Sequence, residues 1–202
     1  MKPSPNTFTE TDLITAREVF RQRESRDLFY RAARELVRLA IAKKTDLTVA
    51  EALGTLLQTW NKSFYRFHAT FDEAHVRALE VLIEERMDYL MRLRSRSIDS
   101  IRVEENASVG QLYTAFEKVL GPVGAAKALH LLAPRFFPLW DRAIANHYGV
   151  RLGRTGENTD NYLRFMSLTQ RQISKLPTLS NDKEVLKMID EYNYCLITKA
   201  WL

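Results

Sequence analysis

The sequence predicts an all-α fold, built as a multi-helix orthogonal bundle. Apolar residues recur at three- and four-residue spacing along most of the chain, which is the pattern of amphipathic helices. Alternating strand-like runs at βα spacing are not apparent, and residues that favour helix N-termini stand directly before several of the apolar stripes. With 202 residues, the chain is long enough to bury a sizeable core.

Three helices are predicted with distinct start signals in the first half of the chain. Ser25 is the candidate N-cap of a helix that reaches about residue 43, and Thr48 is the candidate N-cap of a helix that ends near Trp60. Asp72 opens a longer helix that ends in a basic run. Basic residues at a helix C-terminus oppose the helix dipole favourably, so the run has a structural explanation.

The helical pattern breaks over residues 98–108 and then resumes. Ser108 is the candidate N-cap of a helix that reaches Leu120, and a second helix is predicted over residues 125–132. Two prolines end that second helix, and Asp141 then begins another. Two more helices are expected, over about 159–175 and 181–192.

We therefore divide the chain into three predicted parts. Residues 1–8 are expected to be a disordered lead-in, because prolines and polar residues dominate them. Residues 9–100 form a helical subdomain and residues 101–202 form a second one that contains the hairpin described below. The alternative is one compact domain.

Composition excludes several classes of protein. No apolar run approaches the ~20 residues of a membrane span, and the N-terminus lacks the apolar core of a secretory signal, so a cytoplasmic protein without a membrane partner is expected. The single cysteine, Cys195, cannot form an internal disulfide. The four histidines have no metal-ligand spacing, so no metal site is predicted. Thirty basic residues against 25 acidic ones permit nucleic-acid binding without requiring it.

The most informative segment is the turn between the two helices that meet near residue 121. Leu120 closes the first helix, Gly121 and Gly124 permit a tight turn, and the β-branched Val123 between them can anchor the turn in the core. Such a turn can aim backbone amides at a phosphate, helped by the N-terminus of the following helix. The alternative is a plain connection in which Gly121 only ends the first helix.

This turn and the segment after it resemble the helix-hairpin-helix DNA glycosylases of base excision. The matching residues are Leu120, Gly121, Val123 and Gly124 of the hairpin and Asp141 at the head of a later helix. The resemblance covers about residues 108–150. It implies a glycosylase-like fold, double-stranded DNA as the partner, Asp141 as the catalytic carboxylate, and no cofactor apart from a monovalent cation at the hairpin. The oligomeric state is left open.

The chain departs from the family pattern at the lysine of the bifunctional members. That lysine stands two residues after the last glycine, where this chain has Ala126. Lys127 is one position later, which rotates it by roughly 100° around the helix. The resemblance therefore implies base excision without lyase activity, with water as the nucleophile. Asp141 alternatively serves only as a helix N-cap.

Other candidate residues follow from the same resemblance. The DNA backbone would contact the amides of four hairpin residues: Gly121, Val123, Gly124 and Ala125. It would also contact nearby basic side chains: Lys127, Arg135, Arg142, Arg151 and Arg154. The alternative for these basic residues is solvated surface charge. A base pocket would contain Phe137, Trp140 and His130.

A second aromatic group, in the segment QTWNKSFYRFH that begins at Gln58, is a candidate pocket lip or wedge. For both aromatic groups the alternative is a place in the core. The runner-up function is a non-catalytic helical domain that binds nucleic acid or a protein.

Overall fold

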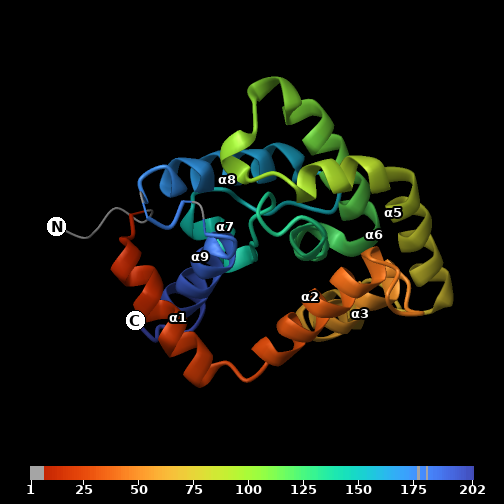
Figure 1. Ribbon diagram of the computed structural model, residues 1–202, viewed down its shortest axis with the longest axis horizontal. Helices are drawn as coiled ribbons and strands as arrows, with labels where there is room; N and C mark the ends of the chain where they lie inside the picture. The colour runs from red at the N-terminus through yellow and green to blue at the C-terminus, as the bar shows by residue number, and fades with distance from the viewer. Residues whose placement is uncertain (1–6, 177, 181) are drawn as a thin grey trace.

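The computed structural model describes residues 7–176, 178–180 and 182–202, and every regular element among them is helical (Figure 1). The α-helices are α1 (Glu10–Arg23), α2 (Asp27–Ile41), α3 (Val49–Trp60), α4 (Lys62–Phe67), α5 (Glu73–Arg94), α6 (Asn106–Leu132), α7 (Arg142–His147), α8 (Thr159–Ile173) and α9 (Val185–Asn193). Two short 3₁₀ helices, η1 (Ile98–Ser100) and η2 (Val103–Glu105), precede α6, and a π-helical turn, η3 (Tyr194–Thr198), follows α9. The all-α prediction is confirmed.

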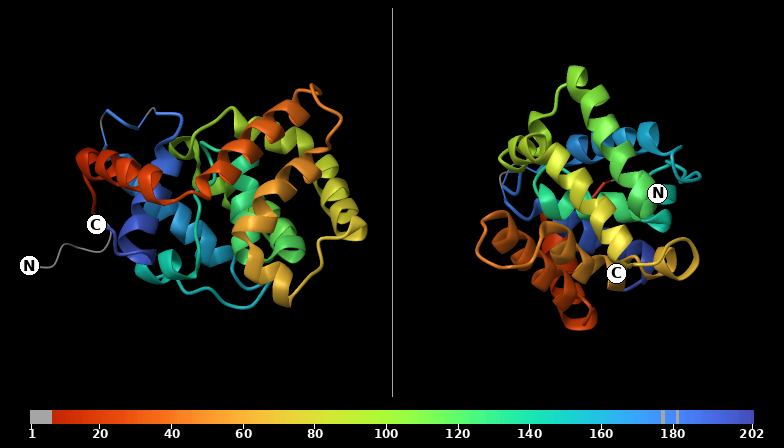
Figure 2. Two further views of the ribbon diagram at one scale, coloured as in Figure 1. Left: turned by 90° about the horizontal axis from the view of Figure 1, so that it is seen from below. Right: turned by 90° about the vertical axis from the view of Figure 1, so that its right-hand side faces the viewer.

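The helices are arranged around α6. This helix contacts α2, α3, α4, α5 and α8, while α1 packs against α9 and η3 (Figures 1 and 2). The two helices at the start of the chain therefore separate, because α2 lies beside α3 and α1 lies beside α9. One cluster of buried side chains includes residues from both sides of residue 100, so the core is continuous across the predicted subdomain boundary.

Helix starts with a local signal form where the sequence places them. Thr48 caps α3 with a reciprocal capping box that includes Glu51, and the carboxylates of Asp72 and Asp141 accept hydrogen bonds at the starts of α5 and α7. Ser25 is not the N-cap of α2, because the Glu24 carboxylate accepts the Arg26 amide at 3.1 Å and the helix starts at Asp27.

Two further sequence predictions need correction. Ser108 lies inside α6 rather than at its start, because η2 leads directly into the helix at Asn106. The predicted disordered lead-in falls mainly on residues 1–6, outside the described residues. At its end, however, Phe8 is ordered, with its ring 5.2 Å from that of Tyr192.

The bend in α6 decides where the site lies. Gly121 has φ 69° and ψ 171°, a left-handed conformation that suits glycine, and Pro122 begins the second half of the helix. A Cβ at Gly121 would lie 2.8 Å from the ring of Phe64, so α4 packs directly against the bend. The second half of α6 therefore leaves the bend in a new direction, beneath the C-terminal end of α3.

Candidate functional site

A cavity of about 300 Å³ opens where α1, α3, α6, α7 and α9 meet. Four of its lining residues are aromatic: Phe20, Trp60, Trp140 and Tyr194. The volume is at the lower end of the range for small-ligand sites. Its remaining lining residues are Glu24, Arg26, Lys127, Leu139, Asp141, Ile144, Asp190, Thr198 and Lys199.

Asp141 lines this cavity from the start of α7. Its Oδ1 atom accepts the Ile144 amide at 2.8 Å, which is the N-cap that the sequence predicts. Trp140, the preceding residue, is buried and donates its indole N–H to the Pro122 carbonyl at 3.1 Å. The Asp141 carboxylate is thus fixed by its own helix and by the bend of α6, and one of its oxygens is not used by the cap.

Lys127 enters the same cavity from the second half of α6. Its ammonium donates to the backbone carbonyl of Trp60, the last residue of α3. Burial lowers the pKa of Lys127 to about 8, and the charges of Asp141 and Asp190 only partly oppose this effect. The ammonium form of Lys127 therefore still predominates at pH 7, and the neutral amine becomes the major form above about pH 8.

Lys127 lies in the cavity beside Asp141 and not on the hairpin surface, where the sequence predicts a phosphate contact. The sequence prediction treats Lys127 as a phosphate contact on the hairpin surface. The structure instead places it inside, half-buried, because the face of α6 that carries it packs beneath the end of α3. A one-residue offset on the helix does not separate Lys127 from Asp141, since both side chains line one cavity.

The predicted amide contacts of the hairpin are mostly covered by α4 and the residue before it. Gly121, Gly124 and Ala125 are buried, and Asn61 packs over Gly124 while its side-chain amide donates to the Leu120 carbonyl at 3.1 Å. Of the four residues predicted to offer backbone amides, only Val123 is partly exposed.

The carbonyls of the bend are also engaged. Pro122 accepts hydrogen bonds from Tyr113 and Trp140, at 3.0 and 3.1 Å, so a monovalent cation at the bend would compete with protein donors.

Two predicted pocket residues lie in the core instead. Phe137 is fully buried and does not line the cavity. His130 is also buried, with Nε2 2.9 Å from the Tyr30 hydroxyl and Nδ1 2.8 Å from the Phe137 carbonyl. Burial lowers the pKa of His130 to about 3, which keeps the ring neutral. Of these three predicted pocket residues, only Trp140 lines the cavity, and Trp60 of the second aromatic group lines it as well.

The predicted arginines are spread over the surface. Arg142, Arg151 and Arg154 are exposed, and Arg142 directly follows Asp141. Arg135 lies beside η1, where its carbonyl accepts the Ile98 amide at 2.8 Å. Besides Lys127, the cations that line the cavity are Arg26 and Lys199, which the sequence did not single out.

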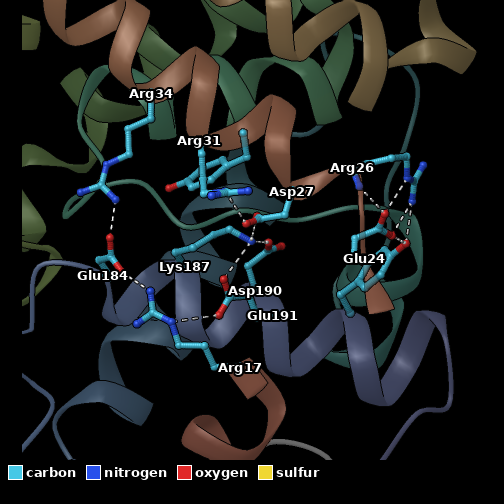
Figure 3. A network of polar contacts seen from close by, with 12 residues as sticks. Arg17, Glu24, Arg26, Asp27, Arg31, Arg34, Glu184, Lys187, Asp190 and Glu191 are labelled. Carbon is cyan, nitrogen blue, oxygen red and sulfur yellow. Dashed lines mark hydrogen bonds and ion pairs between the residues drawn. The ribbon is translucent and has the colours of Figure 1, made fainter. Parts of the chain in front are cut away.

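A buried ionic cluster surrounds Lys187, and one of its members, Asp190, also lines the cavity (Figure 3). This cluster was not predicted from the sequence. The ammonium of Lys187 lies 3.3 Å from Glu191, 3.4 Å from Asp190 and 3.6 Å from Asp27. The ring of Phe20 faces the same ammonium, with its centroid 4.2 Å away. A sequence signal existed in α9, where Lys187, Asp190 and Glu191 follow the three- and four-residue spacing of helical ion pairs.

Comparison with protein families, with curated proteins and with solved structures finds no match to this chain. In the part of the chain that the structure describes, no helix has the length and apolarity needed to cross a membrane. Within those same residues, no three side chains of His, Cys, Asp or Glu are grouped as metal ligands would be.

Proposed function

We propose that this protein is a DNA N-glycosylase that holds an extruded base in the cavity and cleaves its bond to the sugar with the help of Asp141. The observation that carries the proposal is that Asp141 and Lys127 line one cavity of about 300 Å³, which aromatic side chains such as Trp60 and Tyr194 also line. Enzymes that act on a base in duplex DNA extrude it into such a pocket and stack it on aromatic side chains. The resemblance of residues 108–150 to helix-hairpin-helix glycosylases agrees with this arrangement.

Asp141 supplies the negative charge that this reaction requires. Loss of a base leaves positive charge on the sugar ring, and a fixed carboxylate stabilises that charge without reorganisation. The hydrogen bond from Ile144 holds one carboxylate oxygen, and the other is available to the sugar or to an attacking water. In this form of the reaction, water adds at the carbon from which the base departs.

Lys127 supports a second form of the reaction. A neutral amine can displace the base by forming a bond to the sugar carbon as the bond to the base breaks, and the product then opens to an imine. The lowered pKa of Lys127 and its place beside Asp141 favour this form. Borohydride reduction traps an imine covalently, so it distinguishes attack by Lys127 from attack by water.

The test is a cleavage screen on duplexes that carry single damaged or mismatched bases. We expect base release from at least one duplex, abolished in Asp141→Asn and retained in Asp160→Asn, a matched change on the exposed start of α8. A borohydride adduct that disappears in Lys127→Met would establish the lysine form. Unchanged cleavage by Asp141→Asn, with both variants folded, would refute the role of Asp141.

DNA binding is tested separately by its dependence on salt. Arg26, Arg142 and Lys199 lie at or next to the cavity and are the proposed phosphate contacts. Affinity for duplex DNA should fall steeply with added salt, because bound cations release counterions from the phosphates. A flat salt response would exclude this surface.

The runner-up is a non-catalytic domain that binds nucleic acid or a protein. The burial of Gly121, Gly124 and Ala125 favours it, since a covered bend offers few amides to a phosphate. Salt-sensitive duplex binding without base release from any substrate would support this alternative.

A further inference from the structure

Three basic side chains from different segments of the chain gather at the rim of the cavity. Arg23 is the last residue of α1, Arg26 directly precedes α2, and Lys199 directly follows η3. The C-terminal end of the chain lies beside α1, which η3 contacts (Figure 1). All three residues are exposed, and Arg26 and Lys199 also line the cavity. We call these three residues the rim cluster.

Two aromatic rings hold the rim cluster together. The guanidinium of Arg23 lies 5.7 Å from the ring centroid of Trp201, and the ammonium of Lys199 lies 5.8 Å from the same ring. That ammonium is also 5.7 Å from the ring centroid of Tyr194, whose hydroxyl accepts a hydrogen bond from Arg26 at 2.7 Å. An aromatic ring attracts a cation without neutralising its charge. The rings therefore bring positive charges together without cancelling them.

The carboxylate that pairs with Arg26 faces inward and is fully used. Glu24 is 8% exposed, and its two oxygens accept the Nε and Nη2 groups of Arg26 at 2.9 and 2.8 Å (Figure 3). The Arg26 amide and the Tyr194 hydroxyl donate to the same two oxygens. The remaining N–H groups of the guanidinium are on Nη1, which lies away from the edge that Glu24 occupies.

The other two members of the rim cluster have no counter-charge in the protein. Neither Arg23 nor Lys199 forms an ion pair with a residue that the structure describes. Like charges held close together repel one another, and a bound anion relieves this repulsion. The rim thus offers exposed N–H donors and uncompensated positive charge to an anionic group from outside.

Resting on the proposed function, we infer that the rim cluster binds backbone phosphates of the DNA strand whose base enters the cavity. Guanidinium and ammonium groups are the donors that bind phosphate oxygens most strongly in proteins. Because Arg26 and Lys199 belong to both the rim cluster and the cavity lining, a phosphate that they bind lies at the cavity opening. Its own nucleotide is then the one positioned to insert a base.

The experiment measures how the affinity for duplex DNA changes with salt in Arg23→Met and Lys199→Met. Each lost phosphate contact should reduce the slope of log affinity against log salt concentration by about one, and the double variant should reduce it by about two. Arg26→Met is not used, because it would leave the Glu24 charge unpaired. Arg86→Met, at an exposed position of α5 away from the cavity lining, is the matched control and should keep the wild-type slope.

A free nucleotide carries the same phosphate chemistry, so a second measurement separates the two sources. NMR follows the indole N–H signals of Trp201 and Trp60 during titration with deoxyadenosine 5′-monophosphate, and with deoxyadenosine as the control lacking phosphate. Trp201 contacts two members of the rim cluster, and the Trp60 indole donates to the Arg26 carbonyl at 3.2 Å. A phosphate-dependent response with unchanged duplex slopes in both variants would overturn the inference in favour of a free nucleotide.

The result is independent of whether a base is released. Reduced slopes without base release from any duplex would support the rim cluster as a phosphate site and refute the proposed reaction. Base release with wild-type slopes in both variants would overturn the inference and leave the reaction in place. Absence of duplex binding by the wild-type protein would refute both.

Discussion

Two lysines, the half-buried Lys127 and the fully buried Lys187, lie in the same part of the molecule, and their pKa values shift in opposite directions. Burial disfavours the charge of both. Around Lys187, the carboxylates of Asp190, Glu191 and Asp27 outweigh this effect and raise its pKa above the ordinary value. Around Lys127, the charges of Asp141 and Asp190 do not outweigh it, and its pKa falls to about 8.

The difference shows that partners, rather than burial, decide what a buried lysine can do. Lys187 is paired at 3.3–3.6 Å by three carboxylates and holds α2 and α9 together. Its ammonium is not available as a nucleophile. Lys127 hydrogen-bonds to one backbone carbonyl and lines an open cavity, so its amine is the one suited to chemistry.

The largest expected effect is the loss of the Lys187 charge. Lys187→Met should lower the free energy of unfolding by about 3–5 kcal/mol, because Asp27, Asp190 and Glu191 would remain buried without their shared cation. Urea unfolding at pH 7 measures it. Lys183→Met, at an exposed position nearby in the chain, is the control and should change little. A loss below about 1 kcal/mol at Lys187 would show that its charge is not needed by these carboxylates.

Lys127→Met, in contrast, should not lower the free energy of unfolding at pH 7. The folded-state pKa of about 8 lies below the ordinary value of 10.5, so the unfolded chain binds more protons between these pH values. The free energy of unfolding of the wild-type protein should therefore rise relative to that of Lys127→Met from pH 8 to 10.5, by at most about 3 kcal/mol.

Urea unfolding of both proteins between pH 7 and pH 11 measures this difference. At pH 7, Lys127→Met should be as stable as the wild-type protein or more stable, since methionine carries no charge to bury. A constant difference across the pH range would show that the pKa of Lys127 is not lowered.

The sequence predicts the parts of this fold that depend on neighbours in the chain. Thr48, Asp72 and Asp141 cap helices through bonds to amides three residues ahead, which a local pattern reveals. The bend at Gly121 was also predicted. What covers it was not, because Asn61 and Phe64 reach it through tertiary packing.

The cavity itself was predicted only in part. Asp141 and Trp140 belong to the segment that the motif marks, and Trp60 belongs to the second aromatic group, a candidate pocket lip. Asp190, which reaches the cavity from α9, was not predicted. The direction of Lys127 could not be judged from its helical angle alone, since that angle does not show where the neighbouring helix end lies. Local sequence patterns therefore identified some of the residues that line the cavity. Residues brought there by tertiary packing could be identified only from the structure.

The smallest expected effect tests the outer edge of the ionic cluster. Glu184 accepts hydrogen bonds from Arg17 of α1 and Arg34 of α2 (Figure 3). Burial opposes its charge, but these arginines lower its pKa to about 2. Its stabilisation is therefore present above pH 4.5 and is lost as the pH falls toward 2. Because the side chain is 30% exposed, Glu184→Gln should cost only about 1–2 kcal/mol at pH 7.

The difference between Glu184→Gln and the wild-type protein should vanish near pH 2, as measured by urea unfolding at pH 7, 4 and 2. Glu35→Gln removes a surface pair with Arg38 and serves as the control that should change little. If Glu184→Gln cost as much as Lys187→Met, the arginine pairs would be as important as the buried lysine. The expectation that the partly exposed Glu184 pairs contribute less stability than the buried Lys187 would then be wrong.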